Sequence, residues 1–133
     1  MPPVVFLLDD KESELKALGR MLRASGFEVR AWSDPHRFLA EHDPEVPGCL
    51  VLDALTSGPS GLDVQQELMA VGARRCIVFI SASTDVSISQ RAMKAGAFTF
   101  LCKPVRIDDL AATVQAAIHK DAFGRESRRL MAA

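Results

Sequence analysis

The chain lacks any apolar run long enough to cross a bilayer. Its longest runs are VVFLL at 4–8 and CIVFI at 76–80, whereas a transmembrane helix needs roughly 20 apolar residues. The first ten residues, MPPVVFLLDD, have no basic segment before the apolar run and reach an acidic pair at once, which is unlike a secretory signal. We therefore expect a cytoplasmic protein that does not act at a membrane.

The chain also has little excess charge of either sign. Its 16 Lys and Arg residues nearly balance 17 Asp and Glu residues, which leaves a formal net charge of −1. No overall field would attract nucleic acid or an anionic membrane. Aromatic residues make up only 6% of the chain, and no basic segment interleaves with them, so we predict no direct nucleic-acid binding by these residues.

Cysteine and histidine patterns that would hold a transition metal are missing. The three cysteines lie far apart, each in or beside an apolar run, and are Cys49, Cys76 and Cys102. We predict reduced, buried or half-buried thiols rather than a disulfide or a zinc site. The three histidines lie in polar segments of helical period and are His36, His42 and His119. We predict that they face solvent.

The chain does contain a regular alternation of strand-like and helix-like segments. Apolar stretches of strand length are expected at 4–9, 27–32, 49–53, 76–81 and 98–102, and a segment of helical period follows each of them. The clearest helix carries Ile107, Leu110, Ala111, Val114, Ala117 and Ile118 on one face. Five such repeats predict an α/β fold, a doubly wound, five-stranded parallel sheet with helices on both faces. The alternating second strand would lie at an edge.

The length and patterning indicate one domain. The 133 residues are near the common size of a single domain, and the five repeats occupy residues 1–120. Residues 121–133 lose the apolar period and gain three arginines. We interpret this segment as the end of a helix that continues as a tail or as the start of a linker.

Reactive side chains follow four of the five predicted strands. Asp9 and Asp10 end the first, Asp53 the third, Ser81 the fourth and Lys103 the fifth. In a sheet of this kind ligands bind beyond the carboxyl ends of the strands. Clustered carboxylates repel one another, and a single lysine offsets only one of them. An all-oxygen donor set favours magnesium, or manganese, over zinc.

These residues suit the transfer of a phosphoryl group. A carboxylate such as Asp53 is a competent nucleophile toward phosphorus and would form an acyl phosphate. A metal ion on one side, with Ser81 and Lys103 on the other, would hold the phosphoryl oxygens. Each residue also has a plainer reading, because Asp9, Asp53 or Ser81 could cap a helix or a turn. Their joint placement at strand ends favours a site.

Several short motifs carry a family resemblance. LLDD at 7–10, VLD at 51–53, SAS at 81–83 and KAGAFTFLCKP at 94–104, in this order, resemble the receiver domain of two-component response regulators, the CheY-like family. The resemblance covers roughly residues 3–120 and implies strand order 2-1-3-4-5. AMKAGAFTFLCKPV at 92–105 is similar to FixJ-like receivers. In full length these usually carry a LuxR-type helix-turn-helix domain after the receiver.

The resemblance implies roles for the strand-end residues. Asp53 would accept a phosphoryl group from a sensor histidine kinase, and Ser81 and Lys103 would contact that group. Magnesium would be bound by Asp10, by Asp53, by the main-chain carbonyl of Leu55 and, through a water, by Asp9. The domain would be a phosphoacceptor with at most self-catalysed phosphorylation and dephosphorylation, not an enzyme.

The resemblance also implies how phosphorylation would change the surface of the domain. Ser81 would move toward the phosphoryl group, and Phe100, the aromatic switch residue, would turn inward. The changed surface would lie on the fourth helix, the fifth strand and the fifth helix, and the expected members are Arg91, Lys94, Cys102, Arg106 and Asp109. We expect a homodimer of the phosphorylated form and control of transcription through an output domain outside this chain.

One stretch departs from the family pattern and keeps two alternatives open. Thr56 and Ser57 replace the common Met-Pro, with proline moved to position 59, while Gly61 is retained. We expect the altered loop to affect the lifetime of the acyl phosphate and the docking of the kinase more than the chemistry. It also suits a phosphorylation-independent pseudo-receiver that serves as a dimerisation or docking module. The second alternative is a phosphohydrolase of the haloacid-dehalogenase type. Such an enzyme needs a second Asp two residues after the nucleophile as general acid–base. Here that position is Leu55, so the chain lacks this proton donor.

Overall fold

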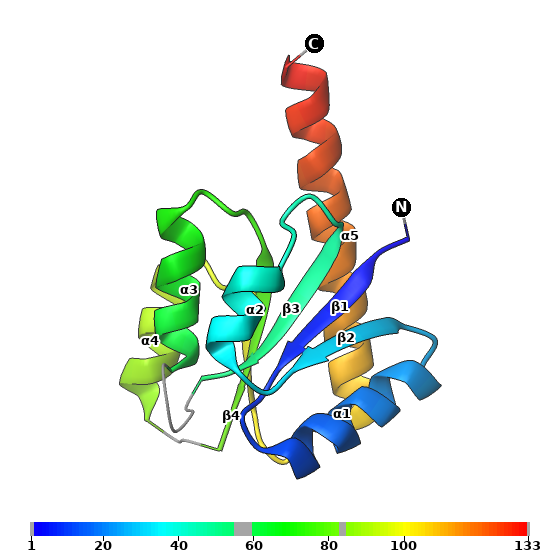
Figure 1. Ribbon diagram of the computed structural model, residues 1–133, viewed down its shortest axis with the longest axis vertical. Helices are drawn as coiled ribbons and strands as arrows, with labels where there is room; N and C mark the ends of the chain where they lie inside the picture. The colour runs from blue at the N-terminus through cyan, green and yellow to red at the C-terminus, as the bar shows by residue number, and fades with distance from the viewer. Residues whose placement is uncertain (1, 55–59, 83–84, 133) are drawn as a thin grey trace.

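The computed structural model describes residues 2–54, 60–82 and 85–132. Within these ranges the chain forms five strands and five helices in alternation (Figure 1). The strands are β1 Val4–Leu8, β2 Glu28–Trp32, β3 Gly48–Asp53, β4 Cys76–Ser81 and β5 Thr99–Cys102. The helices are α1 Glu12–Ala24, α2 Pro35–Glu41, α3 Gly61–Ala70, α4 Val86–Lys94 and α5 Ile107–Ala132. All strand pairs are parallel, in the order β2-β1-β3-β4-β5, which confirms the predicted fold class.

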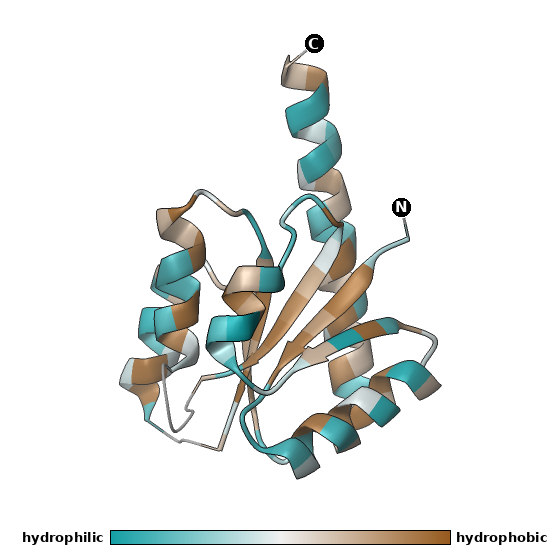
Figure 2. Ribbon diagram, in the orientation of Figure 1, coloured by the Kyte–Doolittle hydropathy of each residue, from teal (hydrophilic) through white to brown (hydrophobic). Residues whose placement is uncertain are grey.

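Two apolar layers hold the helices on the sheet. Successive side chains of a strand point to opposite faces, so Val4, Phe6 and Leu8 of β1 pack with α2, α3 and α4. Val5 and Leu7 pack with α1 and α5 on the other face. β1 and β3 are buried along their whole length, and Figure 2 shows them as apolar ribbons between helices with polar outer faces. The sheet is therefore the middle of three layers.

Side-chain caps fix where three helices begin. Asp34 accepts a hydrogen bond from the His36 amide at the start of α2. Ser60 and Asp63 form a reciprocal capping box at the start of α3, and Asp85 caps α4. The plainer reading of Ser81 as the cap of the fourth helix is therefore wrong.

Helix α5 is longer than its apolar period suggests. It continues to Ala132 and projects past the body of the domain (Figure 1). Buried Asp121 accepts hydrogen bonds from the Gly48 amide at 2.9 Å and from Arg125 Nε at 2.8 Å. Arg125 also donates to the carbonyls of residues 44–46. Polar contacts thus replace apolar packing, and the first part of the expected tail is docked on the domain as helix.

His42 does not face solvent as predicted. Its ring is half-buried against Phe6 and Phe38, and the buried Arg75 lies 2.8 Å from its Nε2. Burial, with the nearby Arg75 charge, lowers the pKa of His42 to about 4. The ring is therefore neutral at physiological pH and accepts a hydrogen bond from Arg75. His36 and His119 are exposed, as predicted.

The cysteines are all free thiols, and one lies differently from the prediction. Cys49 is buried and Cys76 half-buried, but Cys102 is exposed because it ends the edge strand β5. Burial raises the pKa of Cys49 to about 12, so this thiol stays protonated. Among the helices of the described residues, none combines the length and the apolarity of a membrane span.

Candidate functional site

The carboxyl ends of β1 and β3 lie side by side where the strand order reverses. Leu8 of β1 pairs with Leu52 of β3, so the next residues, Asp9 and Asp53, lie next to each other at the carboxyl ends of these strands. Both are buried, with relative exposures of 0% and 3%. Crevices at such a reversal point are the usual ligand sites of doubly wound sheets. The strands therefore place two carboxylates in that crevice.

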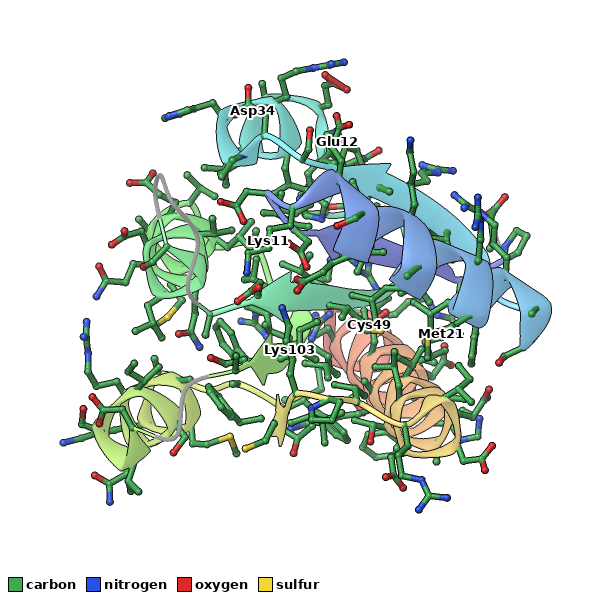
Figure 3. The ribbon with its side chains drawn as sticks, turned by 90° about the horizontal axis from the view of Figure 1, so that it is seen from below. Lys11, Glu12, Met21, Asp34, Cys49 and Lys103 are labelled. Carbon is green, nitrogen blue, oxygen red and sulfur yellow. The ribbon has the colours of Figure 1, made fainter. Side chains whose placement is uncertain are left out.

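Lys103 brings its ammonium group to these carboxylates from the end of β5. Its Nζ lies 2.8 Å from Asp53 Oδ2 and 3.8 Å from Asp9 Oδ2. Figure 3, which looks onto the carboxyl ends of the strands, shows Lys103 between β3 and β5. Its side chain is only 17% exposed, so little solvent screens these ion pairs.

The other two predicted strand-end residues adjoin this group. Ser81 is fully buried at the end of β4, and its carbonyl accepts a hydrogen bond from the Lys103 amide at 2.8 Å. Asp10 directly follows Asp9 and is half-buried. Leu55, whose carbonyl was expected to face the metal, and the altered stretch 56–59 lie outside the described residues.

A third carboxylate reaches Lys103 from α1. Glu14 Oε2 lies 2.6 Å from Lys103 Nζ. Sequence reasoning missed Glu14 because an acidic residue in the first turn of a helix is common there for its effect on the helix dipole. One signal was available: Glu14 lies four residues before Leu18, on the helix face that packs on the sheet.

Burial and pairing shift the pKa values of this cluster in different directions. Burial raises the pKa of Asp9 to about 6, although its hydrogen bond from the Lys11 amide and the charge of Lys103 oppose the shift. The hydrogen bond from Lys103 lowers the pKa of Glu14. Burial alone would lower the pKa of Lys103, but its bonds to Asp53 and Glu14 outweigh burial and raise it. The site thus stabilises the charged form of Lys103 and destabilises the charged form of Asp9.

Asp9→Asn is therefore expected to stabilise the metal-free protein at pH 7.5. The folded-state pKa of Asp9, about 6, exceeds the ordinary aspartate pKa of 3.8, so ionising Asp9 costs stability as the pH rises through that interval. Asparagine keeps an oxygen for the Lys11 amide and removes the charge. Urea unfolding should show a gain of about 1–2 kcal/mol at pH 7.5 that shrinks toward pH 4. A gain that does not change with pH, or a loss, would contradict this assignment.

The donor atoms fit a hard divalent cation. Oxygens of Asp9, Glu14 and Asp53 lie within 4.8 Å of one another. Asp9 Oδ2 is buried and accepts no hydrogen bond from any residue that the structure describes. A buried carboxylate oxygen in this state is costly unless a cation compensates it. Magnesium or manganese, which prefer oxygen ligands, suit this set.

The predicted switch residue lies in the edge strand β5. Phe100 of β5 is half-buried and stacks on Phe79, with 6.2 Å between the ring centroids. It lines a shallow pocket together with Val86 and Met93 of α4. The side chains predicted for the output surface are all exposed, namely Arg91, Lys94, Cys102, Arg106 and Asp109.

Comparison with known proteins identifies relatives of this chain. Residues 5–115 match the model of the response regulator receiver domain. The chain is 39% identical to nodulation protein W of Bradyrhizobium diazoefficiens over 129 residues, 97% of this chain and 57% of that protein. It is 33% identical to the transcriptional regulatory protein FixJ of Azorhizobium caulinodans over 118 residues, 89% of this chain and 56% of that protein.

A solved structure gives the same result. A low-resolution structure of the response regulator StyR superposes with a TM-score of 0.92 at 38% identity, covering 98% of this chain and 66% of that one. The resemblance read from LLDD, VLD and KAGAFTFLCKP is thereby confirmed. The chain spans just over half of the length of these two curated relatives.

Proposed function

This chain belongs to the response regulator receiver domain family, and from that premise we propose that Asp53 accepts a phosphoryl group from a sensor histidine kinase in a magnesium-dependent reaction. The observation that carries the proposal is the pair between Asp53 and Lys103, 2.8 Å apart in the crevice between β1 and β3. A buried carboxylate next to a lysine can attack phosphorus and keep the transferred group in contact with a cation.

The chain's own residues would act as follows. A carboxylate oxygen of Asp53 forms the new bond to phosphorus while the bond between phosphorus and the donor's histidine nitrogen breaks. Lys103 and the hydroxyl of Ser81 would bind the transferred oxygens. Asp10, Asp53 and the carbonyl of Leu55, with Asp9 through a water, would hold magnesium, which when bound supplies charge neutralisation of those oxygens.

The output would be a change of surface rather than catalysis of further turnover. Movement of Ser81 toward the phosphoryl group would let Phe100 turn inward and would shift the populations of two pre-existing states. We propose that the phosphorylated form pairs through α4, β5 and α5. FixJ, a relative, is a transcriptional regulatory protein. We therefore propose that residues 1–120 act in the cytoplasm as a receiver joined through 121–133 to an output domain that controls transcription.

Beryllofluoride with magnesium tests this proposal, because it mimics an acyl phosphate without a kinase. We expect the amide NMR signals of Asp53, Ser81, Phe100 and Lys103 to shift when both reagents are present. Magnesium and fluoride without beryllium serve as the control and should leave the Ser81 and Phe100 signals in place. A spectrum that beryllofluoride leaves unchanged would favour the pseudo-receiver that serves only for dimerisation or docking.

A further inference from the structure

Among the residues that the structure describes, the shortest ion pair of the site joins Lys103 to Glu14, a residue that takes no part in the proposed bond to phosphorus. Glu14 Oε2 lies 2.6 Å from Lys103 Nζ, closer than Asp53 Oδ2 at 2.8 Å. We propose that Glu14 is a positioning residue that holds Lys103 toward α1 in the unphosphorylated protein and must release it to the phosphoryl group. This inference rests on the proposed phosphorylation of Asp53. We call the pair of Glu14 and Lys103 the latch.

Glu14 competes with Asp53 for the ammonium group of Lys103. The ammonium group has three N–H donors; it donates to Glu14 and to Asp53 and has Asp9 at ion-pair distance. Once Asp53 carries a phosphoryl group, its charge moves outward onto the phosphoryl oxygens. Lys103 would follow that charge, and its contact with Glu14 would lengthen as it does so.

The charges of the site also favour the release of Glu14 from Lys103 when Asp53 is phosphorylated. Three carboxylates, Asp9, Glu14 and Asp53, converge on one lysine. Phosphorylation would add a group that carries nearly two negative charges at neutral pH. A carboxylate that stays on Lys103 would then face this group as a like charge at short range. Glu14 therefore favours the unphosphorylated state in two ways, by holding Lys103 and by repelling the phosphoryl group.

Glu14 also has an alternative partner. Lys11 Nζ lies 3.9 Å from Glu14 Oε1, one helical turn away, and the Lys11 side chain is 65% exposed. The Glu14 side chain itself is 34% exposed, against 4% for Asp53. Released from Lys103, the Glu14 carboxylate can turn to Lys11 and to water at small cost. A reversible latch needs such a second position.

Glu14→Gln tests the latch, with Glu12→Gln as the matched control. Glu12 belongs to the same helical turn, is exposed, and makes no hydrogen bond or ion pair with the residues that the structure describes. Figure 3 shows it well separated from Lys103. At saturating magnesium, Glu14→Gln should bind beryllofluoride roughly three- to tenfold more tightly than wild type. Glu12→Gln should bind like wild type.

A second readout reports the contact itself. In the unphosphorylated protein, the NMR signals of the Lys103 Cε methylene should shift in Glu14→Gln and stay in place in Glu12→Gln. Unchanged or weaker beryllofluoride binding by Glu14→Gln, when wild type does bind, overturns the latch alone. Absence of binding to the wild type overturns the proposed phosphorylation and the latch with it.

Discussion

Gly61→Ala is expected to destabilise the fold by about 2–3 kcal/mol and to displace Asp53, the proposed phosphoacceptor. A methyl group at position 61 would lie 2.3 Å from the main-chain oxygen of Asp53 and 3.0 Å from Ala54 Cα. The Gly61 amide donates to the Ala54 carbonyl at 3.2 Å, so α3 begins directly against the end of β3. Backbone cannot rotate away as a side chain can, and either α3 or Asp53 has to move.

Gly19→Ala provides the matched control for this substitution. Gly19 lies inside α1, and the added methyl group would meet only the end of the Arg23 side chain, at 3.0 Å. That flexible end can move, and alanine favours a helix by up to about 1 kcal/mol over glycine. Urea unfolding should show Gly19→Ala unchanged or stabilised. If Gly61→Ala is equally benign, the close contact between α3 and β3 does not hold Asp53 in place.

The fold was predictable because buried strands and helices each have a regular pattern of apolar residues in the sequence. The predicted strand at 76–81 is β4 in full, and VVFLLD at 4–9 differs from β1 by one residue. Strands buried on both faces are apolar throughout, and the polar residues that end them are therefore conspicuous. Asp9 and Asp53 could be identified as neighbours for that reason. Lys103 directly follows the half-buried edge strand β5 and was recognised by its place after the fifth apolar stretch.

The long α5 shows where such reasoning fails. Its buried stripe runs through Val114 and Ile118 to Asp121, and the half-buried Arg125 follows one turn later, so the spacing of the inward positions continues. The side chains at these positions change from apolar residues to an ion pair, which forms hydrogen bonds with the carbonyls of residues 44–46 and the amide of Gly48. Because the apolar period stops there, the sequence predicts the end of the helix at this point.

Contacts between distant polar residues were equally hidden. The pairs of Glu14 with Lys103 and of His42 with Arg75 join segments 89 and 33 residues apart. Either glutamate or histidine alone looks like an ordinary surface residue of a helix. Only the packing of α1 and of the segment after α2 on the sheet brings Glu14 to the half-buried Lys103 and His42 to the buried Arg75.

The central claim is that Asp53 is the residue that becomes phosphorylated. Its most direct test is the intact mass of the protein after incubation with acetyl phosphate and magnesium. Asp53→Asn removes the nucleophilic carboxylate while keeping an oxygen that can accept a hydrogen bond from Lys103. Asp109→Asn makes the same change at an exposed position in the first turn of α5.

We expect the wild type and Asp109→Asn to gain the mass of one phosphoryl group, and Asp53→Asn to gain none. Omitting magnesium should strongly reduce the gain in the first two proteins, because the clustered carboxylates then lack a compensating cation. Uptake by Asp53→Asn equal to that of the wild type, or no uptake by the wild type, would contradict the account.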